Sequence, residues 1–138
     1  MRVSPARRIS GTIAGILLGL AIVVVFDWAG SALFPLPGGL PHEDKAAVAV
    51  ASATLPPWPL VLVLAGWFFA TFVAALMGRR IAHSRLAALA AASVIIACGA
   101  VTMVRAPHPV WFVVAAVAAF TLATWGGWRL GSRAVVER

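Results

Sequence analysis

Four long apolar runs without charged residues dominate the chain, and all the charges lie between or beside them. The runs cover residues 9–26, 60–77, 86–104 and 110–128. A transmembrane α-helix needs roughly 20 mostly apolar residues. Backbone groups in lipid must bond within their own segment, and these runs lack the alternation of barrel strands. The pattern predicts an all-α fold, one four-transmembrane-helix bundle over residues 1–138.

The first run could instead be a cleaved signal peptide, because basic residues precede it. Its apolar stretch is longer than the usual signal core of about 7–15 residues. The sequence Gly30-Ser31-Ala32 that follows is a weak cleavage site. We therefore interpret the run as a retained helix.

The connections between the runs are unequal in length. The two later ones are short, which predicts that the second, third and fourth spans are neighbouring antiparallel helices. The first is long, and its residues 34–39, Phe-Pro-Leu-Pro-Gly-Gly, exclude regular helix. Residues 45–55 follow two acids and end at Pro56-Pro57. This segment is too short to span, and we expect a short interfacial helix in the first outer loop.

Composition supports a membrane protein, and charge gives its orientation. Hydrophobic residues make up 62% of the chain and charged residues 11%, against about a quarter charged in soluble domains. The net charge of +7 would suggest nucleic acid in a soluble protein, but here basic residues flank apolar runs, so no nucleic-acid partner is expected. Nine of the 11 basic residues fall on one side, which predicts cytoplasmic N- and C-termini. These nine are Arg2, Arg7, Arg8, Arg79, Arg80, Arg85, Arg129, Arg133 and Arg138; Lys45 and Arg105 lie on the other side.

Small residues recur every four positions in three of the runs. The stripes are Gly11, Gly15 and Gly19; Gly66, Ala70, Ala74 and Gly78; and Ala115, Ala119, Ala123 and Gly127. This spacing places each set on one helix face, where backbones can approach closely. Packing inside one bundle is the first interpretation. A homodimer seam through the glycine face of the first span is the second.

The spans contain no ionisable group at mid-membrane depth except the single cysteine, Cys98. Ion-coupled exporters usually carry a charge there, and haem-carrying four-helix cytochromes need paired histidines within their helices. Disulfide oxidoreductases need cysteine pairs, so Cys98 is interpreted as a small packing residue. No catalytic motif is present. We expect no catalytic, cofactor-binding or metal site and no enzyme activity.

Polar residues gather instead on the predicted outer face. The possible cluster comprises Asp27, His42, Glu43, Asp44, Arg105 and His108. Carboxylates and imidazoles suit zinc or manganese, but the spacing matches no known ligand pattern. The alternative is a solvated rim with an Asp27–Arg105 ion pair. If the cluster is functional, Asp27, Arg105 and His108 should converge, because they lie at outer span ends.

Two short motifs carry a resemblance. One is Phe34-Pro35-Leu36-Pro37-Gly38 after the first span, and the other is Pro107-His108-Pro109-Val110-Trp111-Phe112 at the fourth. With them the chain resembles a group of small bacterial four-helix inner-membrane proteins. The resemblance implies a bacterial inner (plasma) membrane and no particular chemistry. It also nominates His108 and Trp111 for testing.

These observations favour a small non-enzymatic accessory or structural subunit, held in the lipid bilayer. It would pack against itself as a homo-oligomer or against a larger membrane protein. The alternative is a transporter or channel for a small or lipid-like solute, with its mouth under the first outer loop.

The charge bias makes a direct prediction about topology. Reporter fusions at Ser10, Ser84 and Arg138 should report the cytoplasm, and a fusion at Asp44 should report the outside. Paired phosphatase and fluorescent-protein fusions provide the measurement. An outside signal at Arg138 would rule out four spans.

Overall fold

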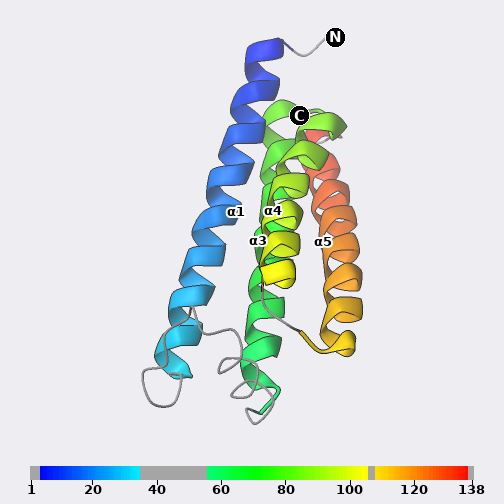
Figure 1. Cartoon of the computed structure of the whole chain (residues 1–138). Coiled ribbons are helices and arrows are strands. Elements are labelled where there is room, and N and C mark those ends of the chain that lie inside the picture. Colours follow the sequence, from blue (N-terminus) through cyan, green and yellow to red (C-terminus); the bar gives the residue numbers. More distant parts are fainter. Residues whose placement is uncertain (1–3, 35–55, 106–107, 137–138) are drawn as a thin grey trace.

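The computed structural model describes residues 4–34, 56–105 and 108–136, and for residues 133–136 the backbone alone. Within these ranges the chain forms α1 (Pro5–Leu33), α3 (Trp58–Ala82), α4 (Arg85–Arg105) and α5 (Val110–Val136) (Figure 1). Each helix is long and apolar enough to cross a membrane. The predicted all-α bundle of four spanning helices is confirmed, and the chain is a multi-pass membrane protein. The interfacial helix predicted at 45–55 lies outside the described residues.

The helices extend beyond the apolar runs that predicted them, most clearly in α1. Ser4 caps this helix by accepting a hydrogen bond from the Arg7 N–H at 3.4 Å, and Pro5 occupies its first turn, where a missing N–H costs nothing. The helix then continues past Asp27 to Leu33. Its 29 residues span about 43 Å, more than the roughly 30 Å of hydrocarbon. The apolar segment of α1 therefore ends at charged residues, whereas the helix itself continues past them.

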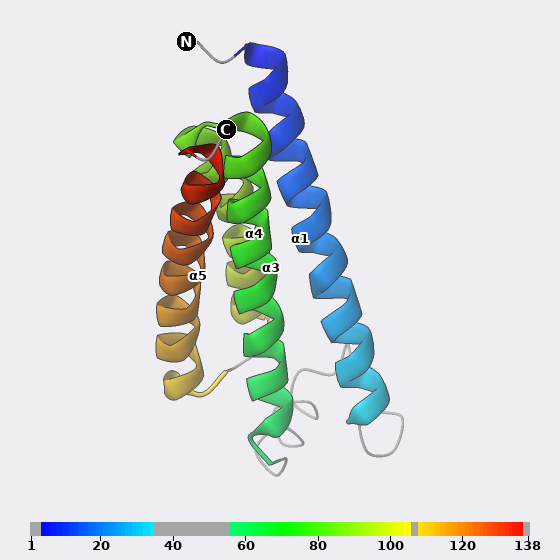
Figure 2. The same cartoon turned by 180° about the vertical axis from the view of Figure 1, so that it is seen from behind.

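Helix α3 is the centre of the bundle. It packs along α1, α4 and α5, whereas α4 and α5 touch each other only sparingly. The arrangement is visible from the front and from behind (Figures 1 and 2). The short connections predicted neighbours in chain order, and this is correct for α3 and α4. Helices α4 and α5 also contact each other, but α5 packs mainly on α3.

The glycine stripe of α1 forms the contact between α1 and the rest of the bundle. Gly11, Gly15 and Gly19 are the buried residues of this helix. A Cβ on Gly15 would lie 2.6 Å from the Ala74 carbonyl oxygen and 3.0 Å from the Ala91 Cβ. The stripe thus packs inside the bundle, as the first interpretation stated. It is not free to form a seam with a second copy.

Helix α5 presents a different stripe from the one predicted. Phe112, Ala116, Phe120, Ala123 and Gly127 are buried, whereas Ala115 and Ala119 are only half-buried. The reason is that the large rings of Phe112 and Phe120 face the bundle, and the rotation of α5 about its axis follows from burying them. Room for Phe120 comes from a glycine on α4: a Cβ on Gly99 would lie 2.6 Å from the Phe120 Cζ.

Two glycines of α1 give a matched test of this packing. Gly15→Ala forces a methyl group into the Ala74 backbone and should destabilise the fold by about 1–3 kcal/mol. Gly30→Ala has its nearest neighbour at 3.8 Å, on Leu62. It should be neutral or stabilise by up to about 1 kcal/mol, because alanine favours helix. Thermal unfolding in detergent micelles measures both, and equal effects would show that the glycine stripe is not tightly packed.

Candidate functional site

The bundle has two chemically distinct ends. At the basic end α1 begins, α3 ends, α4 begins and α5 ends, so the first and the last described helix start and finish there (Figure 1). At the opposite end α1 and α4 end and α3 and α5 begin. The residue types at each end set what that end can bind, and we describe the opposite end first because the predicted polar cluster belongs to it.

An aromatic cluster of His108, Phe112, Trp67 and Phe120 runs from the opposite end toward the middle of the bundle. Trp67 is 5% exposed, and its ring centroid lies 5.7 Å from those of Phe112 and Phe120. Phe112 contacts it edge-on and Phe120 stacks on it, two arrangements that aromatic quadrupoles favour. In this part of the bundle large rings hold α5 on α3, whereas toward the basic end Gly127 brings the two backbones together.

His108 forms the outer edge of this cluster. Its imidazole stacks on the Phe112 ring with 4.7 Å between centroids and 17° between planes, and the residue is half-buried. Pro109 follows, and its carbonyl oxygen accepts the first helical hydrogen bonds, from Phe112 and Val113. Helix α5 begins at Val110, where the apolar run 110–128 predicted its start. Stacking therefore orients the one imidazole at this end of the described bundle.

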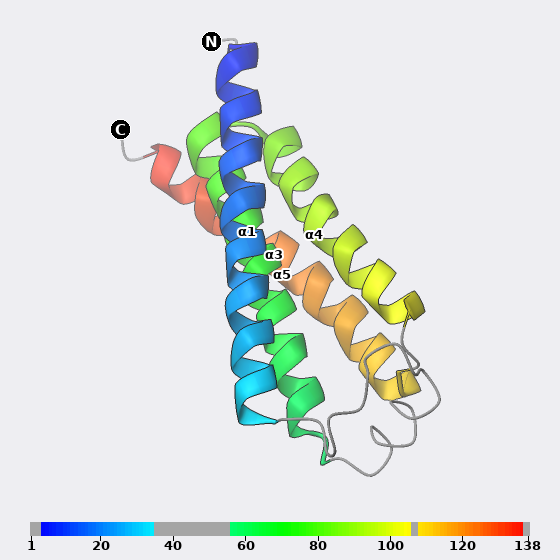
Figure 3. The same ribbon diagram turned by 60° about the vertical axis from the view of Figure 1, so that its left-hand side comes forward.

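The structure does not bring the predicted polar cluster together. Asp27 and Arg105 are exposed, Asp27 in the last part of α1 and Arg105 at the end of α4. Those ends lie apart when the bundle is turned (Figure 3). Among the described residues no ion pair joins Asp27 to Arg105. His42, Glu43 and Asp44 lie outside the described residues.

No group of three potential metal ligands forms within the described ranges. Cys98 is exposed on α4, so its interpretation as a packing residue is wrong. The helix turns its alanines and Ile95 inward instead. In the described part of the chain, what the opposite end presents is the aromatic cluster with His108 at its edge.

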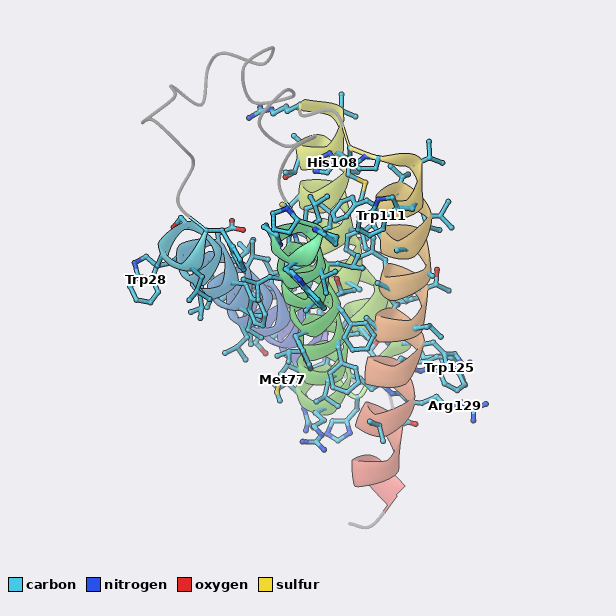
Figure 4. The ribbon with its side chains drawn as sticks, turned by 90° about the horizontal axis from the view of Figure 1, so that it is seen from below. Trp28, Met77, His108, Trp111, Trp125 and Arg129 are labelled. Atoms are coloured by element: carbon cyan, nitrogen blue, oxygen red, sulfur yellow. The ribbon has the colours of Figure 1, made fainter. Side chains whose placement is uncertain are left out.

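Tryptophans mark both ends of the bundle. Seen from the opposite end, Trp111 lies with His108 at the start of α5, whereas Trp28 points away from the bundle (Figure 4). Trp125 and Arg129 point outward together, with the guanidinium carbon 4.9 Å from the indole centroid. Exposed indoles at these levels suit the membrane interface.

The basic end contains contacts that we did not predict from the sequence. The Arg85 guanidinium carbon lies 4.7 Å from the Trp128 ring centroid, a cation–π contact between α4 and α5. Arg79 Nε and Trp128 Nε1 are buried without a hydrogen-bond partner in the described part. Arg7 Nε donates to the Ile81 carbonyl oxygen at 2.9 Å and so ties α1 to the end of α3.

One of these contacts had a signal in the sequence. Arg7, Gly11, Gly15 and Gly19 are each four residues apart, so Arg7 continues the glycine stripe toward α3. The Arg85–Trp128 contact had no such signal, because it depends on how α5 is rotated against α4.

Comparisons with protein-family models, with curated proteins and with solved structures return no match. The function must therefore be argued from the chain itself.

The aromatic cluster makes a graded stability prediction. Trp67→Ala removes the central ring and should cost about 3–5 kcal/mol. His108→Ala removes one stacking partner and should cost about 0.5–1.5 kcal/mol. Trp28→Ala is the control, because Trp28 is 72% exposed, and it should change stability by less than about 0.5 kcal/mol. Thermal unfolding in one detergent ranks the three; a Trp28 loss as large as that of Trp67 contradicts the assignment.

Proposed function

We propose that the chain is a small non-enzymatic accessory or structural subunit of a bacterial inner membrane, with both termini in the cytoplasm. The observation that carries the proposal is the filled interior of the bundle. Along the α1–α3 and α3–α5 seams, Gly15 and Gly127 approach the neighbouring backbone too closely for even a Cβ. Close-packed seams leave no aqueous path between these helices.

The buried side chains are also unsuited to transport or catalysis. The described core consists of alanines, glycines, Ile95 and aromatic rings, with Thr71 and Ser84 as its buried polar residues. No charged residue is fully buried in it; the buried Nε atom belongs to half-buried Arg79 at the basic end. Moving a charged or strongly polar solute through such an interior would require groups that replace its hydration.

The apolar outer surface is what a subunit would use. Large side chains on α1 and α5 point outward; Val24 is 65% and Val117 is 61% exposed. Lipid covers such a surface in a monomer, and a partner helix can replace that lipid where shapes fit. Orientation in this proposal follows the positive-inside rule, with the basic end in the cytoplasm.

A transporter or channel for a small or lipid-like solute is the second candidate, and one observation favours it. Thr71 is fully buried on α3, and its Oγ1 has no hydrogen-bond partner among the described residues. Other span hydroxyls, such as that of Thr124, bond to their own helix. One hydroxyl in a closed interior does not make a path, so we rank this candidate second.

Two measurements on the full chain test the proposal. A photo-crosslinking amino acid at exposed Val24, Val94 or Val117, one for each of α1, α4 and α5, should capture a partner chain in stoichiometric yield, identified by mass spectrometry. The same group at buried Ala74 is the control and should capture none. In parallel, vesicles that contain only this chain should remain impermeable to small ions and sugars. Permeable vesicles, or silence at all three exposed positions, would overturn the proposal.

A further inference from the structure

A groove opens between α1 and α4 at the basic end of the bundle. Its volume is about 300 Å³. Its lining is Arg8, Ile9, Thr12 and Ile13 from α1 and Leu86, Ala87 and Ala90 from α4. Apart from Arg8 and Thr12 this lining is apolar.

The groove exists because α1 leaves α4 toward the basic end. At Gly15 the two helices are in contact, since a Cβ there would lie 3.0 Å from the Ala91 Cβ. One turn earlier, the nearest neighbours of Gly11 all belong to Ala82 of α3. Helix α1 then projects beyond the other helices (Figures 1 and 2). The small side chains of Ala87 and Ala90 form part of the lining, and Ile9 and Leu86 remain 60% and 69% exposed.

Two adjacent arginines at the basic end of α1 have different roles. Arg7 is engaged, because its Nε donates to the Ile81 carbonyl oxygen. Arg8 lines the groove, and its guanidinium has no partner among the described residues. The Thr12 hydroxyl donates a hydrogen bond to the main-chain carbonyl oxygen of Arg8 at 2.9 Å, so this polar group of the lining is satisfied within α1.

The electrostatic surroundings favour an anion. Asp27 is the one acidic residue in the described ranges, and it lies toward the opposite end. Arg7, Arg8, Arg79, Arg80, Arg85 and Arg129 all lie at the basic end. A guanidinium forms paired, charge-assisted hydrogen bonds with phosphate oxygens. The apolar groove continues from that charge along the helices, toward the middle of the bundle.

We propose that this groove binds an anionic phospholipid, with the lipid phosphate on Arg8 and one acyl chain against Ile13, Leu86 and Ala90. A phospholipid has a charged headgroup followed by an apolar acyl chain. The groove has the same order, with Arg8 first and the apolar lining after it. The lipid would belong to the cytoplasmic leaflet if the orientation proposed above is correct. The binding itself does not depend on the proposed subunit function.

The test uses the purified full chain in phosphatidylcholine vesicles, so no partner protein is needed. A trace of phosphatidylglycerol or phosphatidylcholine carrying a photoactivatable acyl chain is added, and labelled peptides are mapped by mass spectrometry. Phosphatidylglycerol should label Ile13, Leu86 and Ala90 in several-fold excess over phosphatidylcholine. Arg8→Gln should lower this labelling about fivefold, the factor that corresponds to about 1 kcal/mol per arginine near anionic lipid.

Matched variants separate the groove from general attraction to the surface. Ala90→Leu fills the groove and should abolish the excess, whereas Ala97→Leu, exposed farther along α4, should not. Arg129→Gln removes a cation at the same end, on α5 and outside the groove lining, and should leave the labelling unchanged. Equal labelling by the two lipids, or equal losses in Arg8→Gln and Arg129→Gln, overturns the proposal. So does a photo-crosslinker at Ala90 that captures a second protein chain in place of lipid.

Discussion

Close approach of the α3 backbone to α1 and α5 is the constraint on which the rest of the structure depends. In lipid, helices gain nothing by hiding apolar side chains from the solvent, because lipid tails are equally apolar. Attraction must come from dispersion between closely packed atoms. Gly15 and Gly127 bring neighbouring backbones together against α3. Because the small side chains face inward along these seams, large residues such as Val24 and Val117 face outward.

The aromatic cluster is the exception to this rule, and glycines also make it possible. Phe120 reaches the interior because Gly99 leaves room for its ring, and the Phe26 ring lies against Gly66 in the same way. Glycine therefore acts in two ways, by close backbone approach along α1 and α5 and by receiving rings from neighbouring helices. The first use leaves a four-residue stripe in the sequence. The second leaves no pattern of its own: Gly99 is isolated in the sequence, and Gly66 belongs to a stripe that does not indicate a ring against it.

The sequence was sufficient for the spans and for part of the packing. Charge-free runs identify helices because lipid forbids unsatisfied backbone, and the stripe of α1 identified its buried face. The outer cluster was predicted less well. Its argument assumed that residues at span ends meet, yet α1 and α4 end apart, which leaves Asp27 and Arg105 separate. Helix tilt and rotation depend on contacts between whole faces, and those of α4 and α5 were not encoded in a simple stripe.

Rotation of a helix also decides what each polar group can do. In the described spans, hydroxyls such as those of Thr12, Thr102 and Thr121 bond to carbonyl oxygens of their own helix, so they do not link helices. Arg7 and Arg8 differ in role although they are adjacent. One residue along an α-helix is about 100° of rotation at 3.6 residues per turn, so their side chains leave different faces of α1. Arg7 shares the glycine face and is used in packing on α3, whereas Arg8 is turned past it and borders the α4 groove. Topology requires basic residues near this end but not their exact position. The lipid-binding proposal therefore depends on the position of Arg8 beside an apolar groove and not on its charge alone.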